Sequence, residues 1–91
     1  MKATPYIQID NERVTVTEWR FPPGAETGWH KHAHDYVVVP VSSGALRLES
    51  ADGTTTARLE SGGSYFRRAG VEHNVINDNA FEFVFVETEL K

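Results

Sequence analysis

The sequence predicts an all-β protein folded as a barrel or sandwich, and three observations support this. Short runs of β-branched and aromatic residues, separated by turn residues, fill nearly the whole chain, and no segment qualifies as a helix. The dipeptide Asp52-Gly53 separates two such runs, as in a tight hairpin. Phe81, Phe83 and Phe85 alternate along the last run, as side chains on one face of a strand do.

Eight strands are expected, each bounded by turn residues. In chain order they cover Tyr6 to Ile9, Arg13 to Phe21, Tyr36 to Val41, Ala45 to Ser50, Thr54 to Leu59, Tyr65 to Arg67, Glu72 to Ile76 and Phe81 to Glu89.

Three of these strands carry further information. The apolar run Val37 to Val41 contains Pro40, which lacks an N–H and is therefore expected at a strand edge or bulge. Asp52-Gly53 readily takes the positive backbone angles of a two-residue hairpin turn. The phenylalanines of the last strand alternate with mostly apolar residues, so this strand is expected at the centre of a sheet or beneath a partner.

Composition limits the class of protein. The 91 residues allow one domain, residues 1–91, and their formal charge of −4 argues against nucleic acid as a partner. The chain has no Cys, so any metal must be held by nitrogen and oxygen. No apolar stretch approaches a membrane span and the first residues lack a secretory pattern, so a cytoplasmic location and no membrane partner are expected.

The histidines are the main chemical signal. His30, His32 and His34 stand at alternate positions, so on a strand His30 and His32 can aim at one point, and His34 joins them if the strand stays regular. Neutral imidazole suits Fe, Zn, Cu and Ni, and a site needs a ligand from elsewhere in the chain. His73 is the remaining histidine.

Two segments resemble the two sequence motifs of the cupin superfamily. Residues 24–32 have a Gly, five residues and then His-x-His, which is similar to the opening of the first motif. Residues 62–77 resemble the second motif, although Arg68 stands where that motif has Pro. The matching positions are Gly62, Gly70, His73 and Asn77. The resemblance implies a cupin-type double-stranded β-helix, or jelly-roll barrel, with His30, His32 and His73 as metal ligands.

Glycines and Asn77 are expected to have structural roles. Gly44, Gly62 and Gly70 fall at strand junctions, where barrel corners need backbone conformations that other residues resist. In the family Asn77 would be a structural residue, and its alternative is an ordinary turn residue.

The chain departs from many metal-binding cupins, which carry a Glu shortly after the second His. Counting forward from His32 puts Tyr36 at the position of this Glu, whereas counting back from Gly44 puts Val37 there. The segment between His32 and Gly44 therefore contains one inserted residue. Asp35 is the nearest carboxylate but is out of phase with the histidines unless a bulge turns it inward. The ligand set therefore consists of three neutral imidazoles, with His34 as another candidate for a fourth ligand.

A three-histidine site keeps the full charge of a divalent ion and leaves positions open for substrate. It resembles the iron sites of cupin thiol and diketone dioxygenases, which favours Fe, although Zn, Mn, Ni and Cu share the same ligand types. Tyr36 could donate a proton or hydrogen bond to a bound oxygen species, as a catalytic residue, or could simply fill the barrel.

Neighbouring residues have weaker assignments. Arg67 and Arg68 are expected to be solvated, with the alternative that one reaches the mouth and pairs with a substrate carboxylate. Trp29 and Phe66 are expected in the wall or core. Lys31 and Glu72 should face away from the histidines.

Three functions are open. The first is a metal-dependent oxidoreductase or isomerase acting on a small organic acid or related metabolite, and the second is a non-catalytic module that binds a small molecule or metal. The third is a structural or regulatory barrel. The chain also resembles short bacterial cupins of β-alanine and other amino-acid catabolism. Its small core and exposed edges predict a homodimer.

Overall fold

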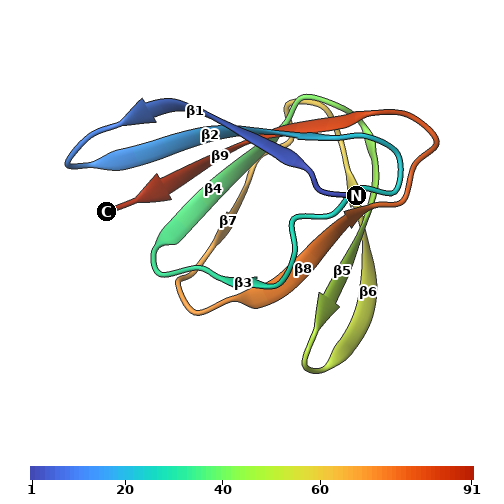
Figure 1. Ribbon diagram of the computed structural model, residues 1–91. Coiled ribbons are helices and arrows are strands. Elements are labelled where there is room, and N and C mark those ends of the chain that lie inside the picture. Colours follow the sequence, from blue (N-terminus) through green and yellow to red (C-terminus); the bar gives the residue numbers. More distant parts are fainter.

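Nine strands form two antiparallel sheets that face each other (Figure 1). The computed structural model describes all residues, 1–91. The strands are β1 (Thr4–Asp10), β2 (Val14–Phe21), β3 (His30–Lys31), β4 (Asp35–Pro40), β5 (Gly44–Ser50), β6 (Gly53–Leu59), β7 (Tyr65–Arg67), β8 (Glu72–Asn77) and β9 (Phe83–Leu90). No element is a helix that is long and apolar enough to cross a membrane.

The larger sheet has the strand order β1-β2-β9-β4-β7, and the smaller has the order β3-β8-β5-β6. Sequence neighbours such as β4 and β5 therefore lie in different sheets, and the chain passes from one sheet to the other several times (Figure 1). The last strand, β9, lies between β2 and β4. This confirms the central position predicted from its two apolar faces.

All eight expected strands are present, with ends that differ by two residues or fewer. β3 is an additional strand of only two residues. It has no run of β-forming residues to reveal it, because it is held by pairing with β8 and not by its own composition. The last strand begins at Phe83 and not at Phe81, whose side chain is 49% exposed in the preceding turn.

The predicted hairpin joins β5 and β6, but its turn lies one residue earlier than expected. Ser50 pairs with Gly53, which leaves Ala51 and Asp52 as the turn residues. Gly53, with φ of 119°, has a positive backbone angle, whereas Asp52 does not. The hairpin is therefore confirmed, and the expectation that Asp52 shares this conformation is wrong.

Pro40 lies at the end of β4, beyond the three residues of that strand that pair with β7. One side of β4 is free of ladder hydrogen bonds at this point, so the missing N–H of Pro40 does not interrupt a pair of strands. This agrees with the expected edge position. The Pro40 carbonyl accepts a hydrogen bond from Gly62 N at 2.8 Å.

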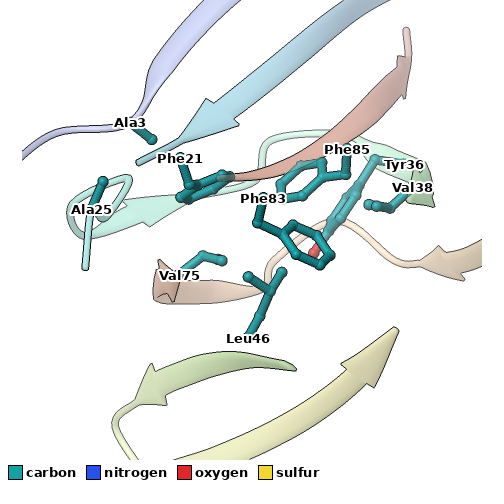
Figure 2. Packing of buried hydrophobic residues seen from close by; sticks show 9 residues of the cluster. All are labelled: Ala3, Phe21, Ala25, Tyr36, Val38, Leu46, Val75, Phe83 and Phe85. Atoms are coloured by element: carbon teal, nitrogen blue, oxygen red, sulfur yellow. The ribbon is translucent and has the colours of Figure 1, made fainter. Parts of the chain in front are cut away.

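The core lies between the two sheets. Phe21 of β2 and Phe83 and Phe85 of β9 approach it from the larger sheet, and Leu46 of β5 and Val75 of β8 approach it from the smaller sheet (Figure 2). The Phe21 and Phe85 rings lie 5.4 Å apart between centroids. Each such side chain contributes about 1.5–3 kcal/mol when it is fully buried, so this cluster holds the sheets together.

Two asparagines close the corner at the end of β8. Asn77 is 1% exposed, and its Nδ2 donates to the carbonyls of Phe21 and Phe81 at 3.0 and 2.8 Å. Its Oδ1 accepts from Asn79 N at 2.9 Å. These bonds connect β8 with the ends of β2 and the β8–β9 turn, which supports the structural role expected for Asn77.

The three corner positions require glycine for two different reasons. Gly62 and Gly70 have φ of 79° and 101°, as expected for positions that other residues resist. Gly44 has no positive φ, so the expected reason is wrong there. A Cβ on Gly44 would lie 2.7 Å from Asn79 Oδ1, and glycine is needed at this position for close approach.

Candidate metal centre

The shortest strand positions the histidines. β3 pairs with β8 so that His30 lies directly opposite His73, and the adjacent pair is Lys31 with Glu72. His32 follows β3, and its backbone continues the contact by donating to Val71 O at 2.9 Å and accepting from Gly70 N at 2.8 Å. The histidines from two distant motifs are therefore brought together by one short stretch of antiparallel pairing.

Three ring nitrogens converge at this point. His32 Nε2 lies 3.0 Å from His30 Nε2 and 3.2 Å from His73 Nε2. Two nitrogens bound to one ion at about 2.1 Å each lie about 3.0 Å apart for a right angle at the metal and about 3.4 Å apart for a tetrahedral angle. The observed spacing falls within this range, so the three side chains fit a single metal ion.

The protonation of the rings also suits a metal. His30 Nδ1 lies 2.8 Å from the Gly28 carbonyl, which can only accept, so Nδ1 carries the proton and the Nε2 lone pair faces the cluster. Burial, together with the neighbouring His30 and His73, lowers the pKa of His32 to about 4. Burial and His30 lower the pKa of His73 to about 4 as well. Both rings are therefore neutral at pH 7, the form that binds metals.

Behind the cluster, Asn74 was not singled out from the sequence but supports His30. It is 3% exposed, and its Oδ1 accepts from Gly28 N at 2.9 Å. Its Nδ2 donates to Glu49 Oε1 at 3.0 Å. Asn74 thus holds the backbone of Gly28, the residue whose carbonyl orients the His30 ring. Asn74 follows His73 on β8, so side-chain alternation places it on the opposite face of the strand, behind the histidines. This alternation is the signal in the sequence that could have pointed to Asn74.

The other predicted site residues occupy different positions. Tyr36 is 3% exposed and its ring stacks on that of His32, with centroids 3.9 Å apart. Burial raises the pKa of its phenol above the usual range. His34 lines the same pocket without joining the cluster of converging nitrogens. Asp35 Oδ1 accepts from Ala69 N at 2.7 Å, so its carboxylate holds a turn.

A pocket of about 580 Å³ opens beside the histidines. Its wall includes Trp19 and Phe85, and also two carboxylates, Glu87 and Glu89 of β9. Glu87 is 8% exposed, and burial together with Glu89 raises its pKa to about 7. Oxygens of both glutamates and a nitrogen of His32 lie within 4.8 Å of one another.

These two glutamates line the pocket, although they were not among the site residues predicted from the sequence. A carboxylate was expected only in the few positions after His32, where many cupins carry a Glu. Because side chains alternate along a strand, Glu87 and Glu89 lie on the same face as Phe83 and Phe85. Continuing the phenylalanine alternation past Val86 would have placed both carboxylates inside the barrel.

The neighbouring residues only partly match expectation. Arg67 lines the pocket and lies over the Tyr65 ring, with its Cζ 4.6 Å from the centroid, while Arg68 is exposed outside it. Trp29 and Phe66 are 59% and 48% exposed and line no pocket, so the expectation that they form wall or core is wrong. Phe66 alternates along β7 with Tyr65 and Arg67, which line the pocket, so its ring faces outward. Lys31 and Glu72 are exposed at the rim.

Comparison with known proteins places this geometry in a family. The model of the cupin domain matches residues 17–88. Beta-alanine degradation protein BauB of Pseudomonas aeruginosa is 62% identical over 90 residues, which cover 99% of this chain and 95% of that protein. The match includes both histidine-bearing segments.

Solved structures agree. A cupin domain from Bordetella pertussis is 63% identical, with a TM-score of 0.98 over 99% of this chain and 94% of that one. The polyketide cyclase RemF from Streptomyces resistomycificus is 19% identical, with a TM-score of 0.78 over 98% of this chain and 65% of that one, and this likeness shows the fold alone. The double-stranded β-helix predicted from the two motifs is confirmed, and this chain belongs to the cupin family.

Proposed function

We propose that this chain is a metal-dependent enzyme with a mononuclear centre held by His30, His32 and His73. Its chemistry would be oxygen-dependent, like that of a dioxygenase, or isomerising, on a small organic acid or related metabolite. The observation that carries the proposal is the convergence of three histidine Nε2 atoms at the wall of one pocket, with His32 Nε2 3.0 and 3.2 Å from the other two.

The protein would contribute position and a dry environment. A divalent ion bound here, with Fe favoured and Zn, Mn, Ni or Cu also able to use these ligands, supplies a Lewis acid with open positions for substrate. Trp19 and Phe85 would supply an apolar part of the pocket wall beside the ion. Tyr36, stacked on His32, holds that ring in place and keeps its phenol protonated at neutral pH.

The name of one relative suggests the chemical class of the substrate. BauB is named for the degradation of β-alanine and is 62% identical to this chain. We therefore propose a substrate from the breakdown of β-alanine or a closely related amino acid. A pocket of about 580 Å³ accommodates a molecule of that size.

The test is metal analysis of protein purified without added metal, followed by oxygen uptake with a panel of thiols, diketones and amino-acid derivatives. His73→Ala removes one of three ligands and is expected to lower metal content to a small fraction of the wild-type value. Asn11→Ala, in the exposed β1–β2 turn, is the matched control and should retain the metal.

The outcomes separate the candidate functions. About one equivalent of iron together with oxygen uptake supports the dioxygenase reading, and Zn or Ni without uptake supports an isomerase or a binding module. Wild-type protein that takes up no divalent metal would contradict the proposal.

We also propose that the chain acts as a homodimer. Strand β1 forms one edge of the larger sheet, and all seven of its residues are exposed. They include Tyr6, Ile7 and Ile9, with exposed fractions of 52%, 66% and 48%. An edge of this kind is a surface on which a second copy can add its own strand.

A further inference from the structure

We propose that Glu87 and Glu89 form a subsite for a cationic group of the substrate, an ammonium, beside the three-histidine centre. The inference rests on the proposed function, because the metal would hold the rest of the same molecule. It adds to that function the substrate class, which is a small amine-bearing compound.

Geometry places the two carboxylates next to the centre and not within it. Glu87 and Glu89 share the inner face of β9, and together with His32 they form a group whose ligand atoms lie within 4.8 Å of one another. The second such group is the three histidines, and His32 is the only residue common to both. Neither glutamate is therefore placed to complete the coordination of an ion held by all three imidazoles.

Glu87 lacks a partner of its own. It is 8% exposed, yet its carboxylate accepts no side-chain or backbone hydrogen bond and takes part in none of the four ion pairs of the chain. No side-chain polar atom of the structure is both enclosed and unpartnered, so the Glu87 oxygens reach the pocket space. A carboxylate in this position is unfavourable by itself and becomes favourable when a cation enters.

The cationic side chains of the pocket do not fill this role. Lys31 and Arg67 both line the pocket, but they are exposed and neither forms an ion pair with Glu87 or Glu89. Arg67 lies over the Tyr65 ring instead. The two carboxylates are therefore left without a cationic partner from the chain and are open to a cation from outside it.

An ammonium fits better than a second metal ion. A second ion would need His32 as a ligand while the Nε2 atom of that ring faces His30 and His73. An ammonium needs only hydrogen-bond acceptors for its three N–H groups, and two carboxylates supply them. A substrate that bridges the two places carries its amine a few bonds from the group that binds the metal.

The experiment measures the binding of n-propylammonium and of n-propanol, its neutral counterpart, to the full chain loaded with one equivalent of Zn²⁺. Titrations are followed by NMR at pH 7 and repeated after chelation, because an ammonium held by carboxylates does not need the metal. The wild type is expected to bind propylammonium about 10-fold to 100-fold more tightly than propanol in both forms.

Three variants test whether the two glutamates cause the preference for propylammonium. Glu87→Gln keeps the shape of the side chain and is expected to remove most of this preference, while its Zn²⁺ affinity stays at the wild-type value. Glu89→Gln serves as a second variant in case Glu87→Gln fails to fold, and should reduce the preference as well. Glu12→Gln, in the exposed β1–β2 turn, should leave the preference unchanged.

Three results would overturn the inference. The first is an equal preference for propylammonium in wild type and Glu87→Gln. The second is a loss of Zn²⁺ by Glu87→Gln as large as that of His73→Ala, which would make Glu87 a metal ligand. The third is a preference that disappears on chelation. If the wild type binds no metal yet prefers propylammonium through Glu87, the subsite stands and the proposed function fails.

Discussion

The side chain of Asn77 stabilises the fold through several buried hydrogen bonds. Its amide donates to the carbonyls of Phe21 and Phe81 and also, at 3.3 Å, to that of Pro22. No water replaces these contacts easily, because the side chain is 1% exposed. One residue therefore satisfies backbone groups from two separate connections.

Asn77→Ala is expected to lower the free energy of unfolding by about 2–4 kcal/mol, because several buried carbonyls lose their donor. Urea denaturation followed by tryptophan fluorescence measures this. Glu12→Ala, at an exposed turn and without side-chain hydrogen bonds, should cost less than about 1 kcal/mol. Equal losses in the two variants would remove the special role of Asn77.

Glu87 makes stability depend on pH in an unusual direction. Its pKa is about 7 in the folded protein against an ordinary 4.5, so the folded state binds the proton more tightly than the unfolded state. The protonated form is favoured on folding, and its stabilising contribution is lost as pH rises from about 4.5 to about 7. His32 and His73 act in the opposite sense, because their pKa values are lowered to about 4.

Comparing Glu87→Gln with wild type isolates this effect, since the histidine contributions are common to both proteins. In metal-free protein, the unfolding free energy of the variant minus that of wild type is expected to increase between pH 4.5 and pH 7. The total increase should be about 3 kcal/mol. A difference that stays constant with pH would mean that the Glu87 carboxyl titrates normally.

Among the elements, every strand except β3 could be predicted, including the three-residue β7. Periodicity and turn residues located β2, β5, β6 and β9 because each has enough residues to show a pattern. β3 is two residues long, and its pairing partner is distant in sequence. Its existence follows from tertiary pairing, which single-sequence patterns do not contain.

The candidate site was predictable to a similar degree. His-x-His spacing and the second motif pointed to the three histidines that the fold brings together. The role of Asn79 could not be predicted, because it depends on which backbone groups lie nearby, and spacing alone does not reveal that. Glu87 was different, because alternation along β9 contained the information.

Gly44 at the start of β5 provides a test of one close approach between elements. Asn79 Oδ1 would lie 2.7 Å from a Cβ at this position, and Asn79 is held in place by its bonds to Ala45 N and O at 3.1 and 2.7 Å. Gly44→Ala is expected to cost about 1–3 kcal/mol of stability, because Asn79 must leave these partners.

The control is the same substitution in an Asn79→Ala background, where the obstacle is absent. Urea denaturation of all four proteins gives the coupling between the two positions. A cost for Gly44→Ala that is the same in both backgrounds would rule out the clash as its cause.

For the whole molecule, the proposed homodimer is open to a direct measurement. Light scattering at micromolar concentration is expected to give twice the 10.2 kDa mass of one chain. Ile7→Glu places a charge on the exposed edge strand β1 and should shift the mass toward one chain. Thr56→Glu, on the exposed edge strand β6, is the control. A wild-type mass of one chain would count against the dimer.

The side-chain pattern of β9 has a consequence for misfolding by a slip in strand register. Phe83, Phe85, Glu87 and Glu89 all share its inner face. If β9 were to slip by one position against β2 and β4, both rings and both acids would turn outward together. A chain with this misalignment would lose the phenylalanines of its core and the carboxylates of its pocket at the same time. Chains that fold stably should therefore also keep the pocket that binds the ligand.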